Sequence, residues 1–376
     1  MTATAPVPTR ALFVSASLGA GGAERFVATV LARLDRGRVT PGLCLFRPDL
    51  SYGLREDVHL DVLDKARPRD IPRAVLRLAR LIDARRPDVV FSAFAHPNFV
   101  TGCALLLARR RPRWIARVSN ELRRGETGAP RPLMRLLYRR AERVVANSRA
   151  LAEALRATYP ALRGRVVYLP NATDFEAIDL LSEEPLAGGP RGGLALLAVG
   201  RLVRQKRIDL IFEALSRLPH ELGASLALCG DGPLRAELAR EARRPELEGR
   251  VRFEGFQRNP YPWMARADLL VLASDHEGSP NALIEAQGLG LPAVATDCPT
   301  GPNEIVEHGR TGLLVPPGDA RALAGAIEAL ARDPERRRAL GAAARERARA
   351  LFDAGPIVRR LEDYLCAPAT RAKTSR

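Results

Sequence analysis

Short apolar runs alternate with segments of helical period along almost the whole chain. Apolar runs bounded by Gly, Pro, Asn or Asp are typical of buried strands, and their alternation with helical segments is typical of βα units in parallel sheets. The sequence therefore predicts an α/β protein with two sets of strands. The expected strands are 11–17, 40–46, 88–94, 114–119, 143–148 and 165–170 in the first half, and 194–200, 224–230, 251–256, 268–274, 292–297 and 312–316 in the second.

The segment 182–193, SEEPLAGGPRGG, separates the two sets of strands. It is rich in Gly and Pro and has no apolar period, which is typical of a linker between domains. We therefore expect a first domain over residues 1–181 and a second over residues 194–350. Both lengths are ordinary for domains with one hydrophobic core.

The chain continues with helical patterns beyond the last expected strand. Residues 319–352 have the apolar spacing of two helices, broken at Pro334. We expect a further helix over 351–366 and a loose polar tail over 367–376.

The positive charge is concentrated in one segment. Of the formal net charge of +16, residues 61–165 carry +15, with 24 Lys and Arg against 9 Asp and Glu. Such an asymmetry favours an anionic partner, either nucleic acid or a membrane surface. The chain has 3 lysines among 59 basic residues, so a solvated arginine surface encoded by a GC-rich genome explains the charge equally well.

The cysteines and the N-terminus exclude several protein classes. Five cysteines are scattered without CxxC spacing, which predicts neither a zinc site nor a disulfide framework and is consistent with a reducing, cytoplasmic setting. The first apolar run is too short for a signal peptide or a spanning helix, and no other run approaches the length of a membrane span.

Polar and glycine residues follow most of the expected strands. In parallel sheets ligands bind beyond the carboxyl ends of the strands, where helix N-termini direct free N–H groups at them. The residues at these ends are Gly21, Gly22, His96, Asn98, Asn120, Glu121, Asn147, Ser148 and Asn171 in the first half, and Arg201 to Lys206, Gly230, Asp231, Asp275 to Glu277, Thr296 and Asp297 in the second. They are the candidates for a polar binding cleft.

The glycines come first along the chain. SLGAGGAERF follows the first expected strand and opens a helix, so that the backbone at Gly21 and Gly22 could approach a phosphate or a sugar closely. The stretch lacks the third glycine and the later acidic residue of a dinucleotide-binding motif. A tight turn without a ligand explains it too.

Lys206 is a lysine in a chain that otherwise uses arginine. In VGRLVRQKRIDL, Arg201 and Lys206 leave a strand and flank the entry to a helix. The planar fork of arginine and the compact charge of lysine suit two adjacent phosphates. We expect a phosphate-binding role rather than a solvated surface.

The stretch SPNALIEAQGLG opens another helix beyond a strand. Ser279 and Pro280 have the residue types of an N-cap and a first helical position, and the helix would begin at Asn281. Free backbone amides at Ala282 and Leu283 could then hold a phosphate.

Two carboxylates flank this helix start. Glu277 precedes the helix and Glu285 lies within it, eight residues later. At this spacing they would hold opposite ends of one ligand rather than share a proton. Helix capping alone does not explain the acidic pair.

EGSPNALIE resembles the Glu-x7-Glu motif of retaining glycosyltransferases of the GT-B type, in glycosyltransferase family 4. GGAERF, VGRLVRQKRIDL, GDGPLR, TDCPTGPNEIV and GLLVP occur in the family's order along most of the chain. The resemblance implies two Rossmann-like domains facing a cleft. The second would bind a nucleotide-diphosphate sugar, the first would bind the acceptor, and the final helix would return to the first domain.

The resemblance also implies roles for residues at matching positions. Arg201 and Lys206 would bind the donor diphosphate, Glu285 the ribose, and Glu277 the sugar hydroxyls near the reacting carbon. Gly21 and Gly22 would lie near the donor phosphates or the acceptor, and His96 would contact the donor sugar unless it is structural. We group Gly230, Asp231, Ser279, Asn281, Ala282 and Leu283 with the donor site, and Asn98, Asn120, Glu121 and Asn147 with the acceptor site. The family commonly has an aromatic residue where Ser279 stands, which leaves the shape of the sugar pocket open.

The sequence contains no Asp-x-Asp triplet, the usual carboxylate pair for a divalent metal on the diphosphate. We expect no metal and no resident cofactor, so that cationic side chains and helix amides would stabilise the leaving nucleoside diphosphate. No enzyme nucleophile is evident beside the donor. Retention would then follow a front-face substitution, as the resemblance implies.

RPLMRLLYRRAERVV places Arg131, Arg135, Arg139 and Arg143 at steps of four residues. A basic amphipathic helix of this kind either lies on an anionic bilayer or packs into the core with a wet arginine face. Similar enzymes often extend lipid-linked oligosaccharides, so we expect reversible association of the first domain with the inner face of the plasma membrane. The expected product is a bacterial surface polysaccharide.

Two other functions compete with this interpretation. The expected donor is a UDP-sugar that supplies a hexose or N-acetylhexosamine, and a GT-B-type epimerase would act on the same UDP-sugar without an acceptor. A nucleic-acid-binding protein would use the arginine-rich half, but aromatic residues do not alternate with the basic ones as they do in stacking surfaces.

Overall fold

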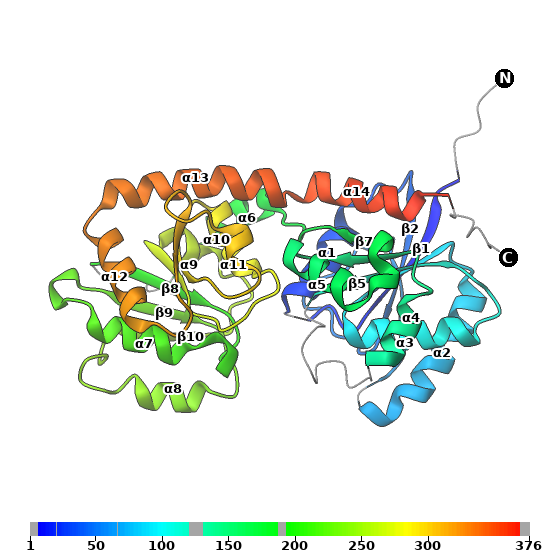
Figure 1. Cartoon of the computed structure of the whole chain (residues 1–376), viewed down its shortest axis with the longest axis horizontal. Coiled ribbons are helices and arrows are strands. Elements are labelled where there is room, and N and C mark those ends of the chain that lie inside the picture. Colours follow the sequence, from blue (N-terminus) through cyan, green and yellow to red (C-terminus); the bar gives the residue numbers. More distant parts are fainter. Residues whose placement is uncertain (1–6, 20, 66, 120–130, 187–192, 369–376) are drawn as a thin grey trace, which may run out of the picture. The chain divides into compact units, whose positions relative to one another are not determined.

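The computed structural model describes residues 7–19, 21–65, 67–119, 131–186 and 193–368. The chain divides into two compact units, Met1–Ala172 with Ala354–Arg376, and Thr173–Asp353. Each unit is built on one parallel sheet, and Figure 1 shows helices packed around each sheet. The fold class predicted from the apolar pattern is confirmed.

The first unit contains a seven-stranded sheet in the order β3-β2-β1-β4-β5-β6-β7. The strands are β1 (Thr9–Ser15), β2 (Val39–Leu45), β3 (His59–Val62), β4 (Val89–Ala93), β5 (Arg113–Val118), β6 (Arg143–Ala146) and β7 (Val166–Tyr168). The helices are α1 (Gly22–Arg33), α2 (Ile71–Arg85), α3 (Ala95–Leu107), α4 (Arg131–Tyr138), α5 (Arg149–Thr158) and α14 (Ala354–Cys366).

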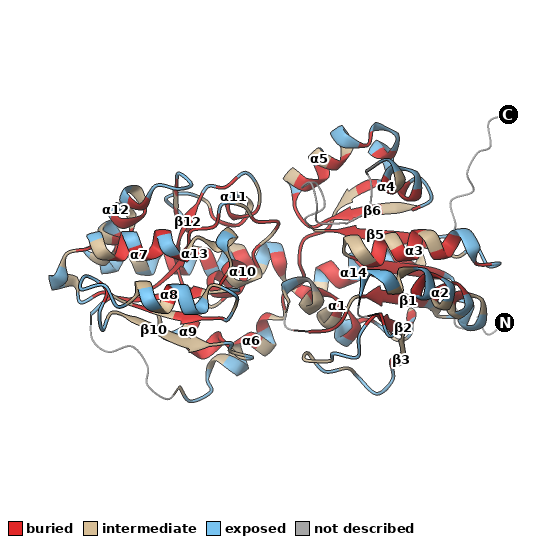
Figure 2. Ribbon diagram, turned by 90° about the horizontal axis from the view of Figure 1, so that it is seen from below, coloured by how far each residue is buried: buried red, intermediate tan, exposed pale blue. Residues whose placement is uncertain are grey.

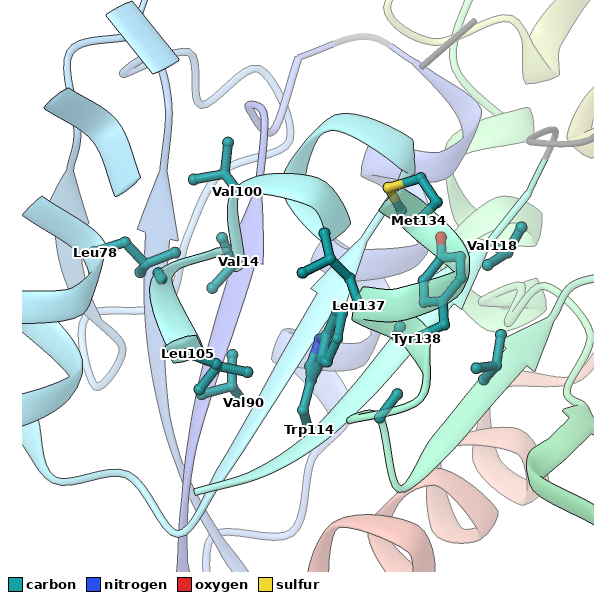
Figure 3. Packing of buried hydrophobic residues seen from close by; sticks show 14 of the residues in the cluster. Val14, Leu78, Val90, Val100, Leu105, Trp114, Val118, Met134, Leu137 and Tyr138 are labelled. Atoms are coloured by element: carbon teal, nitrogen blue, oxygen red, sulfur yellow. The ribbon is translucent and has the colours of Figure 1, made fainter. Parts of the chain in front are cut away.

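Two hydrophobic layers hold this sheet. Residues of α2, α3, α4 and α5 pack on one face, which includes the fully buried Trp114. Figure 3 shows Leu137 beside this ring, while Leu78 lies farther along the same layer, toward Val14. Residues of α1 and α14 cover the other face. Figure 2 shows the central strands of this sheet as mostly buried, the pattern expected where both faces of a parallel sheet are covered, whereas the edge strand β3 is partly exposed.

The final helix belongs to the first unit, as predicted. On α14, Glu362 is 2% exposed and accepts a hydrogen bond from the backbone N–H of Asp35 at 2.7 Å and one from Arg38 Nη1 at 3.1 Å. These bonds fix α14 to the loop between α1 and β2. The apolar side of the helix packs against the sheet.

The second unit contains a six-stranded sheet in the order β10-β9-β8-β11-β12-β13. The strands are β8 (Ala195–Val199), β9 (Ser225–Cys229), β10 (Val251–Gly255), β11 (Leu269–Leu272), β12 (Ala293–Thr296) and β13 (Gly312–Val315). The helices are α6 (Phe175–Ser182), α7 (Ile208–Arg217), α8 (Arg235–Glu241), α9 (Tyr261–Arg266), α10 (Asn281–Gly288), α11 (Pro302–Ile305), α12 (Ala320–Ala331) and α13 (Pro334–Phe352).

The boundary between the units differs from the one expected at the glycine-rich segment. Helix α6 lies within the second unit, where Phe175 and Ile178 are buried in its core and Asp179 pairs with Arg349 at 2.6 Å. Its apolar face packs against α9 and α10, so the chain enters the second unit at Thr173, before the expected linker. Pro334 starts α13, as the break predicted between the two helices requires.

Candidate functional site

The second sheet changes strand order between β8 and β11. These neighbouring strands pair in parallel, and the chain then leaves them in opposite directions across the sheet. Such a switch point is where open α/β sheets bind ligands, because the loops beyond the two strands separate and leave a crevice. The loop after β8 carries Arg201 and Lys206, and the loop after β11 carries Glu277.

Gly230, beyond β9, lets the backbone approach the loop after β8 closely. A Cβ atom at this position would lie 1.8 Å from the carbonyl oxygen of Gly200. The Gly200 N–H donates to the Cys229 carbonyl at 3.0 Å, and the Leu202 N–H donates to the Asp231 carbonyl at 2.9 Å. Gly230 and Asp231 therefore support the loop through their backbone.

The loop after β8 ends in a short 3-10 turn, Arg204–Lys206, joined to the loop after β11. Gln205 Nε2 donates to the His276 carbonyl at 2.6 Å, and the Asp275 N–H donates to the Gln205 carbonyl at 3.0 Å. Arg207 follows in the left-handed region, with φ of 47°, and pairs with Asp275 at 3.2 Å. These contacts fix the position of Lys206.

Lys206 and Glu277 form an ion pair across the switch point. Lys206 Nζ lies 2.5 Å from Glu277 Oε1, and the same oxygen accepts a hydrogen bond from Ser274 Oγ at 2.7 Å. Ser274 is fully buried, and the Glu277 side chain is 9% exposed. No described residue donates a hydrogen bond to the second oxygen, Oε2, which leaves it available to a ligand hydroxyl.

The cavity that Lys206 lines is too small for a substrate. A cavity of about 10 Å³ lies between Gly200, Lys206, Ile211 and Ala273, enough for about one water molecule. A ligand must therefore contact Lys206 and Glu277 from the solvent side. Above them, Thr300 Oγ1 donates to the Glu277 carbonyl and anchors the following loop.

The start of α10 differs from the prediction. Pro280 is the N-cap, with extended φ and ψ of −71° and 107°, so Ser279 is not the N-cap. The Leu283 amide donates to the Pro280 carbonyl at 3.1 Å and is not free for a phosphate. The expected amide site is therefore wrong at Leu283, while Asn281 and Ala282 lie at the first turn, partly exposed.

The remaining donor candidates differ in exposure. Glu285 is 2% exposed on α10, far more enclosed than Arg201, which is exposed beyond β8 and pairs with no carboxylate of the described residues. Ser279 is half-buried between Glu277 and α10.

In the first unit the glycines and His96 follow neighbouring strands. Gly21 is the N-cap of α1, in an extended conformation, and Gly22 is the exposed first residue of the helix. His96 is half-buried at the start of α3, beyond β4, which pairs with β1. Burial and the charge of Lys65 lower the pKa of His96, so the ring is neutral at pH 7.

The structure corrects the acceptor assignment of Asn98. Its side chain is fully buried, its Oδ1 accepts from Ser92 Oγ at 2.6 Å, and its Nδ2 donates to the Arg117 carbonyl at 2.9 Å. This amide joins β4 to β5 in the core and does not reach a substrate. Asn147 is also buried, at 5% exposure, although its Oδ1 has no hydrogen-bond partner among the described residues. Asn120 and Glu121 lie outside the described residues.

The expected basic helix is shorter than its arginine spacing suggested. Helix α4 ends at Tyr138, Arg139 lies in a turn, and Arg143 begins β6, so the four arginines do not share one helical face. Met134 and Leu137 are buried, so α4 packs into the core, which was the second of the two alternatives. The chain must turn after Tyr138 because β6 starts four residues after Arg139.

Several positioning residues were missing from the sequence-based set. Ser274 and Thr300 orient Glu277 and its loop, although the sequence analysis did not include them. Gln205 lay within the candidate range Arg201 to Lys206 but had no role of its own, and it joins the two loops. Their positions gave a partial signal, since Ser274 ends an expected strand and Thr300 lies in TDCPTGPNEIV.

Neither a ligand cluster for a metal nor a membrane span is found in the described part of the chain. Residues 7–19, 21–65, 67–119, 131–186 and 193–368 contain no group of three or more His, Cys, Asp and Glu side chains placed to bind an ion. Within the same ranges, every helix is too short or too polar to cross a bilayer. The five cysteines are free.

Comparisons with known proteins agree with the geometry. Residues 20–177 match the family described as Glycosyltransferase Family 4, and residues 193–333 match the family described as Glycosyl transferases group 1. The chain is 29% identical over 366 residues to the N-acetylgalactosamine-N,N'-diacetylbacillosaminyl-diphospho-undecaprenol 4-alpha-N-acetylgalactosaminyltransferase of Campylobacter jejuni, covering 93% of this chain and 97% of that one. It is 35% identical over 170 residues to the lipopolysaccharide core biosynthesis glycosyltransferase LpsE of Rhizobium meliloti, 45% of each chain.

Solved structures show the same fold. Alr3699/HepE of Anabaena in complex with UDP-glucose has a TM-score of 0.79 and 22% identity, covering 96% of this chain and 100% of that one. Sucrose-phosphate synthase of Thermosynechococcus elongatus has a TM-score of 0.79 and 22% identity, covering 94% and 98%. The fold of the chain is therefore the GT-B fold.

Proposed function

Since the chain belongs to the glycosyltransferases of family 4 and group 1 and serves the synthesis of polysaccharides or lipid-linked glycans, we propose that it transfers a hexose or N-acetylhexosamine from a UDP-sugar. The acceptor is a glycan or a lipid-linked oligosaccharide. The transfer retains the anomeric configuration and needs no metal.

The ion pair between Lys206 and Glu277 carries this proposal. At the switch point of the second sheet, Lys206 supplies positive charge to the donor diphosphate. Glu277, held at Oε1 by Lys206 and Ser274, presents Oε2 to the hydroxyls of the sugar. The solved neighbour HepE binds UDP-glucose, which supports a UDP-sugar as the donor.

The charges around the pair support departure of the nucleoside diphosphate without a metal ion. When the bond between the anomeric carbon and the diphosphate breaks, negative charge grows on the leaving phosphate oxygen. Lys206 is already in place, and Arg201 is exposed beside it without a carboxylate partner among the described residues. Both cations can compensate this charge, and no described nucleophile is required if the acceptor attacks from the same face.

The acceptor proposal rests on the Campylobacter relative, whose name specifies a diphospho-undecaprenol-linked acceptor. We extend it to reversible membrane association of the first unit, because Leu76, Leu107 and Leu136 are exposed on α2, α3 and α4. Arg73 on α2 and Arg135 on α4 are exposed and pair with no carboxylate of the described residues. Sedimentation with anionic vesicles at low and high salt tests the membrane association. We expect binding at low salt that high salt weakens, and a protein that does not bind at low salt would exclude the association.

A thermal-shift screen against UDP-, GDP- and ADP-sugars tests the donor proposal. We expect UDP-sugars to stabilise the wild type and the Glu277→Ala variant, whereas Lys206→Ala loses this stabilisation. Turnover, measured as UDP release, should be lost in Glu277→Ala. Activity that chelators abolish and manganese restores would exclude the metal-independent mechanism.

The relatives do not favour the two competing functions. An epimerase would convert the UDP-sugar in the absence of an acceptor, which product analysis of that reaction detects. A nucleic-acid-binding protein would shift labelled DNA or RNA in a gel, and heparin would compete.

A further inference from the structure

Lys65 is a buried lysine at the carboxyl edge of the first sheet. It follows β3 by three residues and is 7% exposed. The chain has 3 lysines among 59 basic residues, and the other lysine in the described part, Lys206, lies at the site proposed above. The choice of lysine here suits a compact charge in a restricted space, because the planar guanidinium of arginine needs more room.

One aromatic ring lies against the Lys65 side chain, and a second ring packs on the first. Its Nζ lies 5.3 Å from the centroid of the Phe46 ring, which follows β2. The His96 ring, beyond β4, meets the same Phe46 ring edge-on at 6.4 Å. In the order β3-β2-β1-β4 these residues all lie at the end of the sheet where Gly21 and Gly22 follow β1.

No described carboxylate pairs with Lys65. The neighbouring Asp64 pairs instead with Arg77 at 3.1 Å, and Asp70 accepts the Arg67 amide at 2.7 Å. Arg47 is exposed and adds to the positive charge. Burial is the largest influence and lowers the pKa of Lys65, the negative charge of Asp70 comes next and raises it, and Arg47 lowers it further.

A buried cation without a counter-ion destabilises the folded state unless a ligand supplies the missing charge. The backbone on both sides of this cluster is also strained. Asp64, directly before Lys65, has φ of 53°, and Phe94, two residues before His96, has φ of 82°. Positive φ at residues other than glycine gathers at ligand sites, where the surrounding structure holds it.

We propose that Lys65, bordered by Arg47, Phe46 and His96, binds a phosphate group of the acceptor. The inference rests on the proposed function, because it assigns the acceptor to this unit. Phosphate suits the site because its charge compensates Lys65 and Arg47 together. Neutral His96 can donate a hydrogen bond to a phosphate oxygen or accept one from a sugar hydroxyl.

Two substrates carry phosphate, so the experiment must separate them. A lipid-linked acceptor has a phosphate or diphosphate between the glycan and the lipid, and the donor has its own diphosphate. Farnesyl diphosphate represents the first source and UDP the second. Farnesol, which lacks phosphate, controls for binding of the lipid chain alone.

The test is isothermal titration calorimetry of the full chain with these three compounds. Lys65→Met removes the charge but keeps an unbranched apolar side chain beside Phe46, and Lys65→Arg keeps the charge. Arg163→Met is the matched control, since Arg163 is an exposed cation of the same unit without a described partner. Circular dichroism melting verifies that each variant is folded.

We expect Lys65→Met to weaken farnesyl diphosphate binding about tenfold or more, the effect of losing one charge-assisted hydrogen bond. Lys65→Arg keeps the charge but needs more room, so its affinity should lie between those of Lys65→Met and the wild type. Arg163→Met should retain the wild-type affinity. UDP binding should be the same in all variants.

The inference is overturned if the wild type does not bind farnesyl diphosphate, if Lys65→Met binds it as the wild type does, or if farnesol binds equally well. A Lys65→Met variant that loses UDP affinity instead would assign the phosphate to the donor and overturn the acceptor assignment. A wild type that binds no UDP would contradict the proposed function, whatever the Lys65 variants do.

Discussion

Lys206 and Lys65 each lie beyond the carboxyl end of a parallel strand, one in each unit, in different electrostatic surroundings. Lys206 pairs with Glu277 at 2.5 Å, and its loop is joined to the neighbouring loop by Gln205. Lys65 is more deeply buried, lies against an aromatic ring and has no described carboxylate partner. A paired cation is held in place before the substrate arrives, whereas an unpaired one gains most from an anionic ligand. The contrast therefore separates a positioned catalytic cation from a cation suited to binding.

The largest effect should come from removing the charge at the paired site. We expect Lys206→Met to reduce kcat by about 100-fold to 1,000-fold, the range found when one preorganised group that stabilises transition-state charge is lost. Initial rates of UDP release at saturating substrates measure this. Arg204→Met, in the same 3-10 turn and exposed, is the control and should retain the wild-type rate. Equal rates for Lys206→Met and the wild type would show that Lys206 is not a catalytic cation.

The next effect concerns Gly230, which packs against the loop that carries Lys206. Gly230→Ala places a Cβ atom against the Gly200 carbonyl, where the backbone must move, and should destabilise the fold by about 1–3 kcal/mol. Urea unfolding measures the change. Gly325→Ala is the matched control, because Gly325 lies within α12 with no atom near the added Cβ, and it should be neutral or stabilising. Equal stability of both variants would show that the close approach does not constrain the loop.

Most of the fold follows from the apolar pattern, since twelve of the thirteen strands found in the described chain were expected. The missed strand, β3, is four residues long with the sequence HLDV and lies at the sheet edge, where one exposed and three half-buried residues give no apolar run. Helix α6 was assigned to the first unit because its amphipathic sequence does not specify which sheet it covers. The spacing of Arg131, Arg135, Arg139 and Arg143 suggested one helix, but Arg143 is the first residue of strand β6.

The site was predictable in part. The sequence placed Lys206 and Glu277 at strand ends, because parallel strands bring their carboxyl ends together. It gave no sign of their direct contact, since 71 residues separate them and the pairing depends on the order of β8 and β11. Asn98 shows the opposite error: an amide beyond a strand suggested a ligand, yet it satisfies hydrogen bonds inside the core. Residue type alone does not distinguish these two uses.

A smaller effect should come from the hydroxyl that orients Glu277. Ser274→Ala removes one of two hydrogen bonds to Glu277 Oε1 and leaves the Lys206 pair intact. We expect kcat to fall about tenfold, corresponding to one charge-assisted hydrogen bond, with little change in UDP affinity. Ser216→Ala, on the exposed side of α7, should have no effect. A rate that remains unchanged in Ser274→Ala would mean that Lys206 alone orients the carboxylate.

The smallest effect concerns His96, which reports the unpaired charge of Lys65. Burial first and Lys65 second lower the pKa of His96 in the folded protein. In the unfolded chain His96 has its ordinary pKa of about 6.5 and therefore binds a proton more readily than in the folded protein. The free energy of unfolding that depends on the neutral ring is fully present above this ordinary pKa and is lost as the pH falls through the folded pKa. In NMR titrations, with His96→Gln identifying the signal, the His96 pKa should rise in Lys65→Met but stay below the ordinary value, because burial remains. Correspondingly, Lys65→Met should lose less stability than the wild type between pH 7.5 and pH 5.5. An unchanged His96 pKa in Lys65→Met would mean that the charge of Lys65 does not act on His96. The contrast between a paired Lys206 and an unpaired Lys65 would then have no electrostatic support.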